Sequence, residues 1–227
     1  FAPLAACFPG AFGLTDDAAT ISLAADEELV VTADLLTAGV HFRADDPPDR
    51  IAQKALRVNL SDLAAKGAVP RSYLLSLALP CDWQLPWMEA FAKGLAADQK
   101  EFSVSLIGGD TTATDGPFTI AITAMGSLPS GTMILRSGAK PGDLVFVSGT
   151  IGDAGAGLAA LNGSLPGAAD VERHILEHRY QTPSPRVTLG AALRGIATAA
   201  LDVSDGLLAD LGHIASTSNV RAVVEAE

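Results

Sequence analysis

The chain has 227 residues, of which 48% are hydrophobic and only 5% are aromatic. This composition predicts a globular fold with a core of small aliphatic side chains, and it argues against general disorder. The formal net charge is −11, and Lys and Arg form no cluster. Proteins that bind nucleic acid or anionic membranes through a basic surface are therefore excluded as a class.

Cysteines and hydropathy predict a cytoplasmic protein. Cys7 and Cys81 follow no metal or disulfide spacing motif, which favours ordinary thiols in a reducing compartment. The longest uncharged run, residues 116–135, is interrupted by prolines and glycines, so we expect no membrane-spanning helix. The first fifteen residues lack a basic region, and no signal peptide is predicted.

The first half of the chain alternates short apolar runs with amphipathic stretches. The runs predict strands over 29–33, 73–79, 102–107 and 118–127. The amphipathic stretches predict helices over 49–66 and 86–100. Prolines before the first helix and Gly67 after it are typical of helix ends.

The turn-rich residues 128–143 predict a domain boundary near residue 135, which gives domains 1–134 and 135–227. In the second domain we expect helices after the Gly-rich segment 149–157 and over 170–180, 185–196 and 205–216. Strands are expected over 144–148, 199–203 and 220–226. About 90 residues are few for such a domain, so we expect it to be incomplete.

Aspartates recur where strands are predicted to end. Asp16–Asp17 precede an apolar run, Asp34, Asp110 and Asp202 end predicted strands, and Asp205 opens a helix. The ends of strands form the ligand crevice of α/β folds, and carboxylates are ligands that Mg²⁺ prefers. Each aspartate alone can be a turn or cap residue, but together they favour a site for metal and phosphate.

Asp62 differs because it lies inside a predicted helix. It shares a helix face with Asn59 and Lys66. Two interpretations stay open: an exposed polar face with a weak ion pair, or a buried carboxylate that needs a partner or a metal.

The segment 106–112, Leu-Ile-Gly-Gly-Asp-Thr-Thr, is the sharpest local motif. Its glycines would permit close approach to a phosphate, its aspartate could bind a metal, and its threonines could donate to phosphate oxygens. The alternative is a Gly-Gly turn with a capping aspartate. Arg136 could pair with a phosphate or lie on a surface linker, and His41 could contact a ligand or be structural.

Other phosphotransferase motifs are absent from the sequence. It contains no P-loop, no protein-kinase signature and no persuasive nucleophile with an orienting base. This fits direct phosphoryl transfer, in which positioning and charge neutralisation dominate.

In combination, these motifs resemble the thiamine-monophosphate kinase family of the aminoimidazole-ribonucleotide-synthetase-like superfamily. The resemblance rests on segments that occur in family order: 16–19, 32–34, 39–42, 54–65, 106–112, 136–143 and 202–207. It implies a two-domain α/β (α+β) fold with mixed sheets and helices on one side, and a homodimer. It also implies transfer of the ATP γ-phosphate to thiamine monophosphate with several Mg²⁺ ions.

The resemblance also implies roles for single residues. Mg²⁺ ligands would be Asp17, Thr32, Asp34, Asp62, Asp110, Asp202 and Asp205. Contacts to ATP would come from Gly109, Asp110, Arg136 and Ser204, and His41 would contact thiamine monophosphate.

Departures from the family pattern keep alternatives open. Ala33 stands where the family usually has a hydroxyl residue, Leu14–Thr15 replace the usual Ile-Gly, and the family extends beyond residue 227. The alternatives are another ATP-using enzyme of the superfamily and a non-catalytic module that binds nucleotide or metal.

Overall fold

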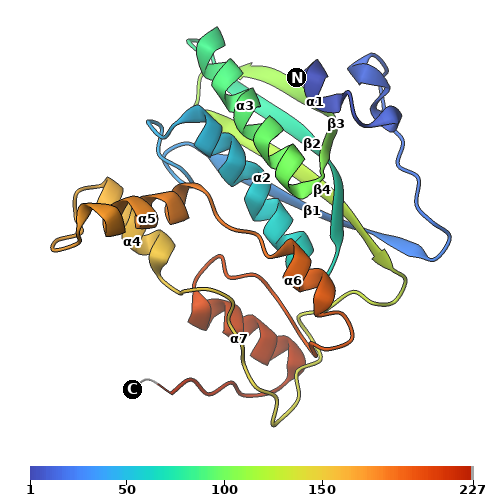
Figure 1. Ribbon diagram of the computed structural model, residues 1–227, viewed down its shortest axis with the longest axis vertical. Helices are drawn as coiled ribbons and strands as arrows, with labels where there is room; N and C mark the ends of the chain where they lie inside the picture. The colour runs from blue at the N-terminus through green and yellow to red at the C-terminus, as the bar shows by residue number, and fades with distance from the viewer. Residues whose placement is uncertain (226–227) are drawn as a thin grey trace.

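The computed structural model describes residues 1–225, whose sheet and main helices are shown in Figure 1. Its four strands are β1 (Glu27–Thr37), β2 (Val69–Pro80), β3 (Ser105–Thr114) and β4 (Thr119–Pro129). They lie in the order β1-β4-β2-β3, with β2 and β3 parallel and the other two pairs antiparallel. The mixed sheet confirms the predicted fold class.

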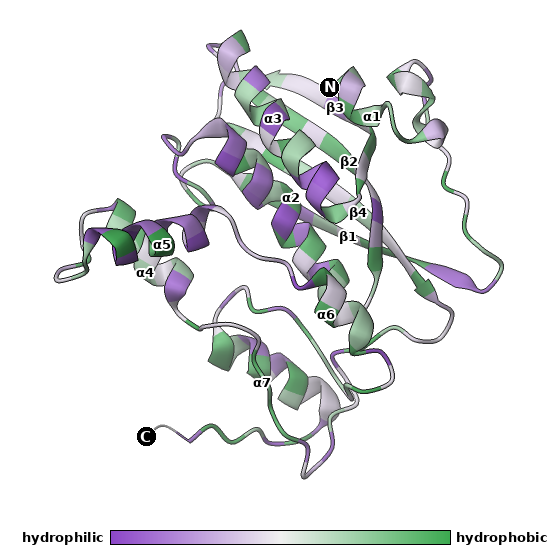
Figure 2. Ribbon diagram, viewed as in Figure 1, coloured by the Kyte–Doolittle hydropathy of each residue, from purple (hydrophilic) through white to green (hydrophobic). Residues whose placement is uncertain are grey.

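Two long helices, α2 (Pro48–Ala65) and α3 (Leu85–Phe102), cover one face of this sheet. Both confirm the sequence prediction, and both have a proline in the first turn, where its missing N–H costs nothing. Figure 2 shows that hydrophilic and hydrophobic positions alternate along them, as amphipathic helices require.

The core between helices and sheet combines small aliphatic residues with one aromatic cluster. Ala52 and Ala55 of α2 are fully buried. Trp87 stacks on Phe91 at a centroid distance of 5.5 Å and meets Phe118 edge-on at 5.0 Å. Such edge-on and stacked pairs add to the energy of simple burial.

The other face of the sheet is covered in part by the N-terminal segment, which contains α1 (Ala2–Ala5) and a 3₁₀ helix (Pro9–Leu14). Ala5 and Ala11 pack there with Ile107 and Met125. This packing places part of the N-terminal segment across the sheet from α2 and α3, while Leu4 of α1 reaches the helix side, where its carbonyl accepts from Gln99 of α3.

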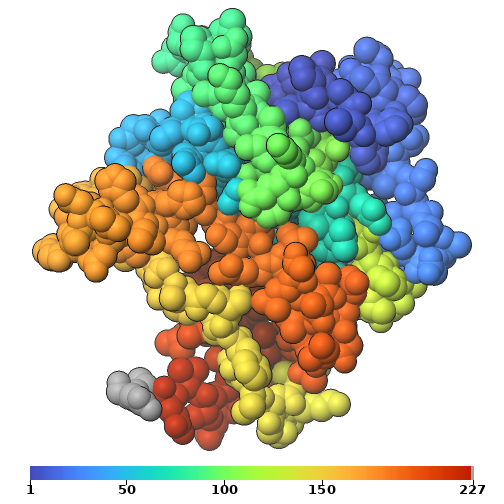
Figure 3. All heavy atoms as spheres, in the orientation of Figure 1, coloured from blue at the N-terminus to red at the C-terminus, as the bar shows by residue number. Residues whose placement is uncertain are grey.

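The second half of the chain contains α4 (Asp153–Leu161), α5 (Asp170–Gln181), α6 (Val187–Ala192) and α7 (Leu207–Ser218). In Figure 3 the residues of α5 and α6, in orange, lie against the region of α2. The approach is close because a Cβ on Gly190 would collide with the carbonyl oxygen of Ala64. Within residues 1–225, no helix is long and apolar enough to cross a membrane.

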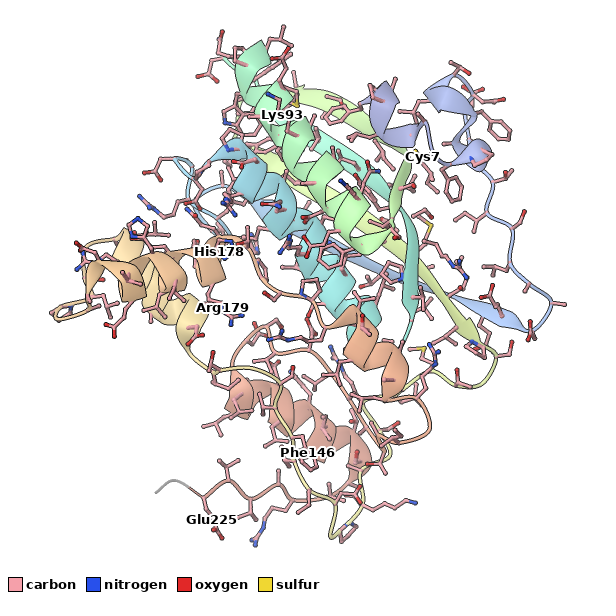
Figure 4. The ribbon with its side chains drawn as sticks, viewed as in Figure 1. Cys7, Lys93, Phe146, His178, Arg179 and Glu225 are labelled. Carbon is pink, nitrogen blue, oxygen red and sulfur yellow. The ribbon has the colours of Figure 1, made fainter. Side chains whose placement is uncertain are left out.

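The strands predicted over 144–148 and 199–203 are wrong, and so is the described part of 220–226; residue 226 lies outside the described residues. Strand formation needs a partner for the backbone, and residues 144–147 instead expose their apolar side chains. Figure 4 labels Phe146, which is 86% exposed, in this extended segment.

The helix predicted over 185–196 is shorter than expected: α6 has six residues. The domain boundary near residue 135 stays a prediction.

Candidate functional site

A hydrogen bond between β1 and α2 forms the centre of the candidate site. Asp34 pairs in register with the buried Ile122, so alternation along β1 turns Thr32 and Asp34 toward the helices. The hydroxyl of Thr32 donates to Asp62 Oδ2 at 2.5 Å. Asn59, one turn earlier, is fully buried and donates to the carbonyl of Ala55. The exposed-face interpretation is therefore wrong for Asn59, whereas Asp62 and Lys66 are half-buried.

Two carboxylates, those of Asp34 and Asp202, lie near Asp62. Burial raises the pKa of Asp34, and the nearby charge of Asp62 raises it further. Burial also raises the pKa of Asp202 to about 6, again with Asp62 as the next cause. Asp62 is therefore close to two carboxylates that come from segments far apart in the sequence. A cation bound there would relieve their repulsion.

Two basic side chains border these carboxylates. Lys66, one turn after Asp62, donates from Nζ to the carbonyl of Ala200 at 2.8 Å. Burial lowers the pKa of Lys66, and so does the charge of Arg136, while Asp202 and Asp62 raise it. Arg136 and Lys66 thus bring positive charge beside the acidic group. Sequence reasoning treated Lys66 only as a possible ion-pair partner, although its spacing from Asp62 placed it on the same helix face.

His41 lies at the rim of the same site. Its Nδ1 accepts a hydrogen bond from the backbone N–H of Thr37 at 3.0 Å. Lys54 of α2 donates to the His41 carbonyl at 2.8 Å and lies 3.5 Å from the centre of the Tyr180 ring. Burial lowers the pKa of Lys54 to about 8. The sequence pattern gave no signal for Lys54 or Tyr180.

Asp110 and Asp17 are not brought into this group. β3 continues through Thr114, so Asp110 lies inside a strand. The residue before it, Gly109, pairs with Leu75 of β2. Leu75 is buried under the helices, so the side chain of Asp110 lies on the opposite face. Asp17 is exposed in the N-terminal segment that packs on that other face. The expectation that all the aspartates share one crevice is met only in part.

Strand pairing gives Gly109 a structural reason to be glycine. Its φ is +150°, and a Cβ there would collide with the carbonyl oxygen of Leu75. β1 likewise continues three residues beyond Asp34, to Thr37. These two aspartates were predicted at strand ends, but each strand continues past its aspartate.

In the segment 202–206, one side chain faces the site and others are exposed to solvent. Asp202 faces Asp62, whereas Ser204 and Asp205 are exposed. Their backbone N–H groups donate to the carboxylate of Asp210, a buried residue that sequence reasoning missed. Its position in the first turn of α7 was the available signal.

The donor chemistry fits Mg²⁺ that is shared with a phosphate ligand. Among residues 1–225, no three acidic, histidine or cysteine side chains gather closely enough to hold a metal by themselves. Mg²⁺ commonly binds one or two carboxylates plus substrate phosphates and water. Asp62, Asp202 and the hydroxyl of Thr32 supply such hard oxygen atoms.

Comparison with known proteins identifies the family. The family model described as AIR synthase related protein, N-terminal domain, matches residues 15–128. The chain is 48% identical over 225 residues to the thiamine-monophosphate kinase of Caulobacter vibrioides. That match covers 99% of this chain but 63% of the Caulobacter protein, so the chain spans less than two thirds of its length.

Solved structures agree with the sequence comparison. The thiamine-monophosphate kinase from Stenotrophomonas maltophilia K279a is 47% identical, with a TM-score of 0.83 over 91% of this chain and 66% of that one. The structure described as AaThiL complexed with AMPPCP and TMP is 32% identical, with a TM-score of 0.80 over 92% of this chain and 71% of that one. The chain therefore belongs to the AIR synthase related family, in which it is similar to thiamine-monophosphate kinases.

Proposed function

We propose that the protein phosphorylates thiamine monophosphate to thiamine diphosphate with ATP. The observation that carries this proposal is the group of Asp34, Asp62 and Asp202, oriented by Thr32 and bordered by Lys66 and Arg136. The similarity to a protein solved with AMPPCP and TMP supports a nucleotide and a phosphorylated acceptor as ligands.

The side chains of the site have distinct tasks in this proposal. The hydroxyl of Thr32 fixes the Asp62 carboxylate, and Asp62 and Asp202 would hold Mg²⁺ together with phosphate oxygens. Asp34, near Asp62, is a further predicted ligand. Mg²⁺ bound there would neutralise phosphate charge. Arg136 would contact the ATP phosphates, and His41 would contact the acceptor. Asp17, Asp110 and Asp205 as further ligands, Gly109 and Ser204 as ATP contacts, the homodimer and the cytoplasmic location stay predictions from the resemblance and the composition.

The chemistry proposed is direct transfer. An oxygen of the acceptor phosphate forms a bond to the γ-phosphorus while the bond from that phosphorus to the ADP oxygen breaks, and ADP leaves. Phosphoryl transfer depends mainly on positioning and on neutralised charge, so no protein nucleophile is needed. The absence of a nucleophile–base motif in the sequence is in keeping with such a site.

The test is an assay of the full-length enzyme with ATP, Mg²⁺ and thiamine monophosphate. We expect thiamine diphosphate, and we expect Asp62→Asn to lower kcat/KM by roughly 100-fold or more, as loss of a charge-stabilising group does. Asp115→Asn, in the exposed loop before β4, is the matched control and should leave the rate unchanged. Binding of an ATP analogue without turnover, or turnover only with another acceptor, would reject the proposal.

A further inference from the structure

The helix α7 holds the segment 202–206 at its N-terminal end. Asp210 is only 4% exposed, and its Oδ2 accepts the backbone N–H of Ser204 at 2.9 Å and of Asp205 at 3.1 Å. A buried carboxylate needs hydrogen-bond donors, and these two N–H groups supply them. The backbone that carries Ser204 is thereby fixed to the helix.

The same helix holds a second segment at its C-terminal end. The hydroxyl oxygen of Ser218 accepts the backbone N–H of Gly138 at 3.1 Å and of Ala139 at 3.2 Å. The same hydroxyl donates to the carbonyl of Arg136 at 3.4 Å. The backbone that carries Arg136 is therefore tied to the last turn of α7.

The two held segments also run side by side. The N–H of Ala200 donates to the carbonyl of Leu135 at 2.9 Å, directly before Arg136 in one segment and two residues before Asp202 in the other. α7 thus spans from one proposed ATP-contacting segment to the other. Their spacing depends on its length and on side chains at its two ends.

We propose that α7 is the element that positions Arg136 relative to Ser204, with Asp210 and Ser218 as positioning residues. This inference rests on the proposed function, because it takes both segments to contact ATP. Neither Asp210 nor Ser218 touches substrate in this proposal. They act on ATP binding indirectly, through the backbone N–H groups whose hydrogen bonds they accept.

The first test measures amide hydrogen exchange in the full-length enzyme. Asp210→Ala should speed exchange in the peptide that covers 203–206, and Ser218→Ala should speed it in the peptide that covers 136–140. Ser216→Ala, an exposed hydroxyl on the same helix, is the matched control and should change neither. Unchanged exchange in both variants overturns the inference, whether or not the enzyme makes thiamine diphosphate.

The second test separates positioning from general stability. Asp210→Ala and Ser218→Ala should raise KM for ATP roughly tenfold, the usual effect of losing hydrogen bonds to a charged or polar anchor. KM for thiamine monophosphate should stay unchanged, and Asp210→Asn should restore much of the ATP affinity because its amide oxygen still accepts. An equal rise in both KM values overturns the inference. If Asp210→Ala fails to fold, Ser218→Ala at the half-exposed end of α7 carries the test. A wild-type enzyme without activity would reject the proposed function instead.

Discussion

At the scale of single residues, the raised pKa of Asp202 makes the stability of the protein depend on pH. Its pKa is raised to about 6 from an ordinary 3.8, chiefly by burial and then by the charge of Asp62. A carboxyl with a raised pKa binds its proton more tightly in the folded state than in the unfolded state. Between about pH 4 and 6 the folded state therefore holds more protons, and the free energy of unfolding falls as pH rises.

We therefore expect Asp202→Asn to stabilise the metal-free enzyme against unfolding. The gain should be absent near pH 4 and grow to about 1–2 kcal/mol above pH 6, because one pKa unit corresponds to about 1.4 kcal/mol and solvent screens part of it. Urea denaturation in the presence of EDTA measures this difference, with Asp115→Asn as the exposed control. A gain that does not vary with pH would contradict the electrostatic cause.

Individual candidate residues could be picked out from the sequence more easily than the set of residues that lie together in the structure. Asp62 stood out in the sequence because it lies among apolar helical residues, and its bond to Thr32 confirms that it has a partner. The separation of Asp110 from Asp34 could not be predicted, because it depends on the register of three successive strand pairings. A shift of one residue along β3 decides which face its side chain takes.

At the scale of elements, one buried ion pair joins α2, α3 and the segment before α6. Arg57 donates from Nε and Nη2 to the two oxygens of Asp98, each at 2.8 Å, and Asp98 is fully buried. Arg57 also donates from Nη1 to the carbonyl of Pro183 at 3.3 Å. A paired geometry of this kind fixes both the distance and the rotation between the helices.

Breaking this pair should be costly because it leaves a buried charge without its partner. We expect Arg57→Met to lower the free energy of unfolding by about 3–5 kcal/mol. Arg43→Met breaks the pair with Asp45, whose side chain is 70% exposed, and should cost less than about 1 kcal/mol. Chemical denaturation measures both, and similar losses in the two variants would argue against this role for Arg57.

Elements with local signals were predicted well, whereas elements that need a distant partner were not. α2 and α3 follow from proline, apolar spacing and amphipathicity, and the structure reproduces both. Residues 144–148 have a composition that favours a strand but have no strand beside them. Composition supplies the tendency to form a strand, and only tertiary structure supplies the hydrogen-bond partner.

At the scale of the whole molecule, the unpaired segment 144–147 sets the tendency to self-associate. Leu144 and Phe146 are 78% and 86% exposed, and unpaired extended backbone is a template for pairing between chains. The net charge of −11 opposes such contact. The balance between these two effects should depend on salt, since salt screens only the charge.

We expect this chain to form larger species as its concentration and the salt concentration rise. Phe146→Lys should reduce that association severalfold, as charged residues on exposed strands do. Val171→Lys is the control, because Val171 is also exposed but lies on α5, whose backbone is paired. Light scattering of the three proteins measures the effect, and equal scattering by both variants would show that general hydrophobicity is responsible.

The two-ended contact of α7 has a consequence for the order in which the protein becomes complete during synthesis. The bond from Gly138 to Ser218 joins residues 80 positions apart, whereas the sheet and its helices are contained in the first 129 residues. Contacts between distant residues form late because a long loop must close first. A growing chain can therefore build its sheet early, but the backbone around Arg136 becomes fixed only after the ribosome has released residue 218.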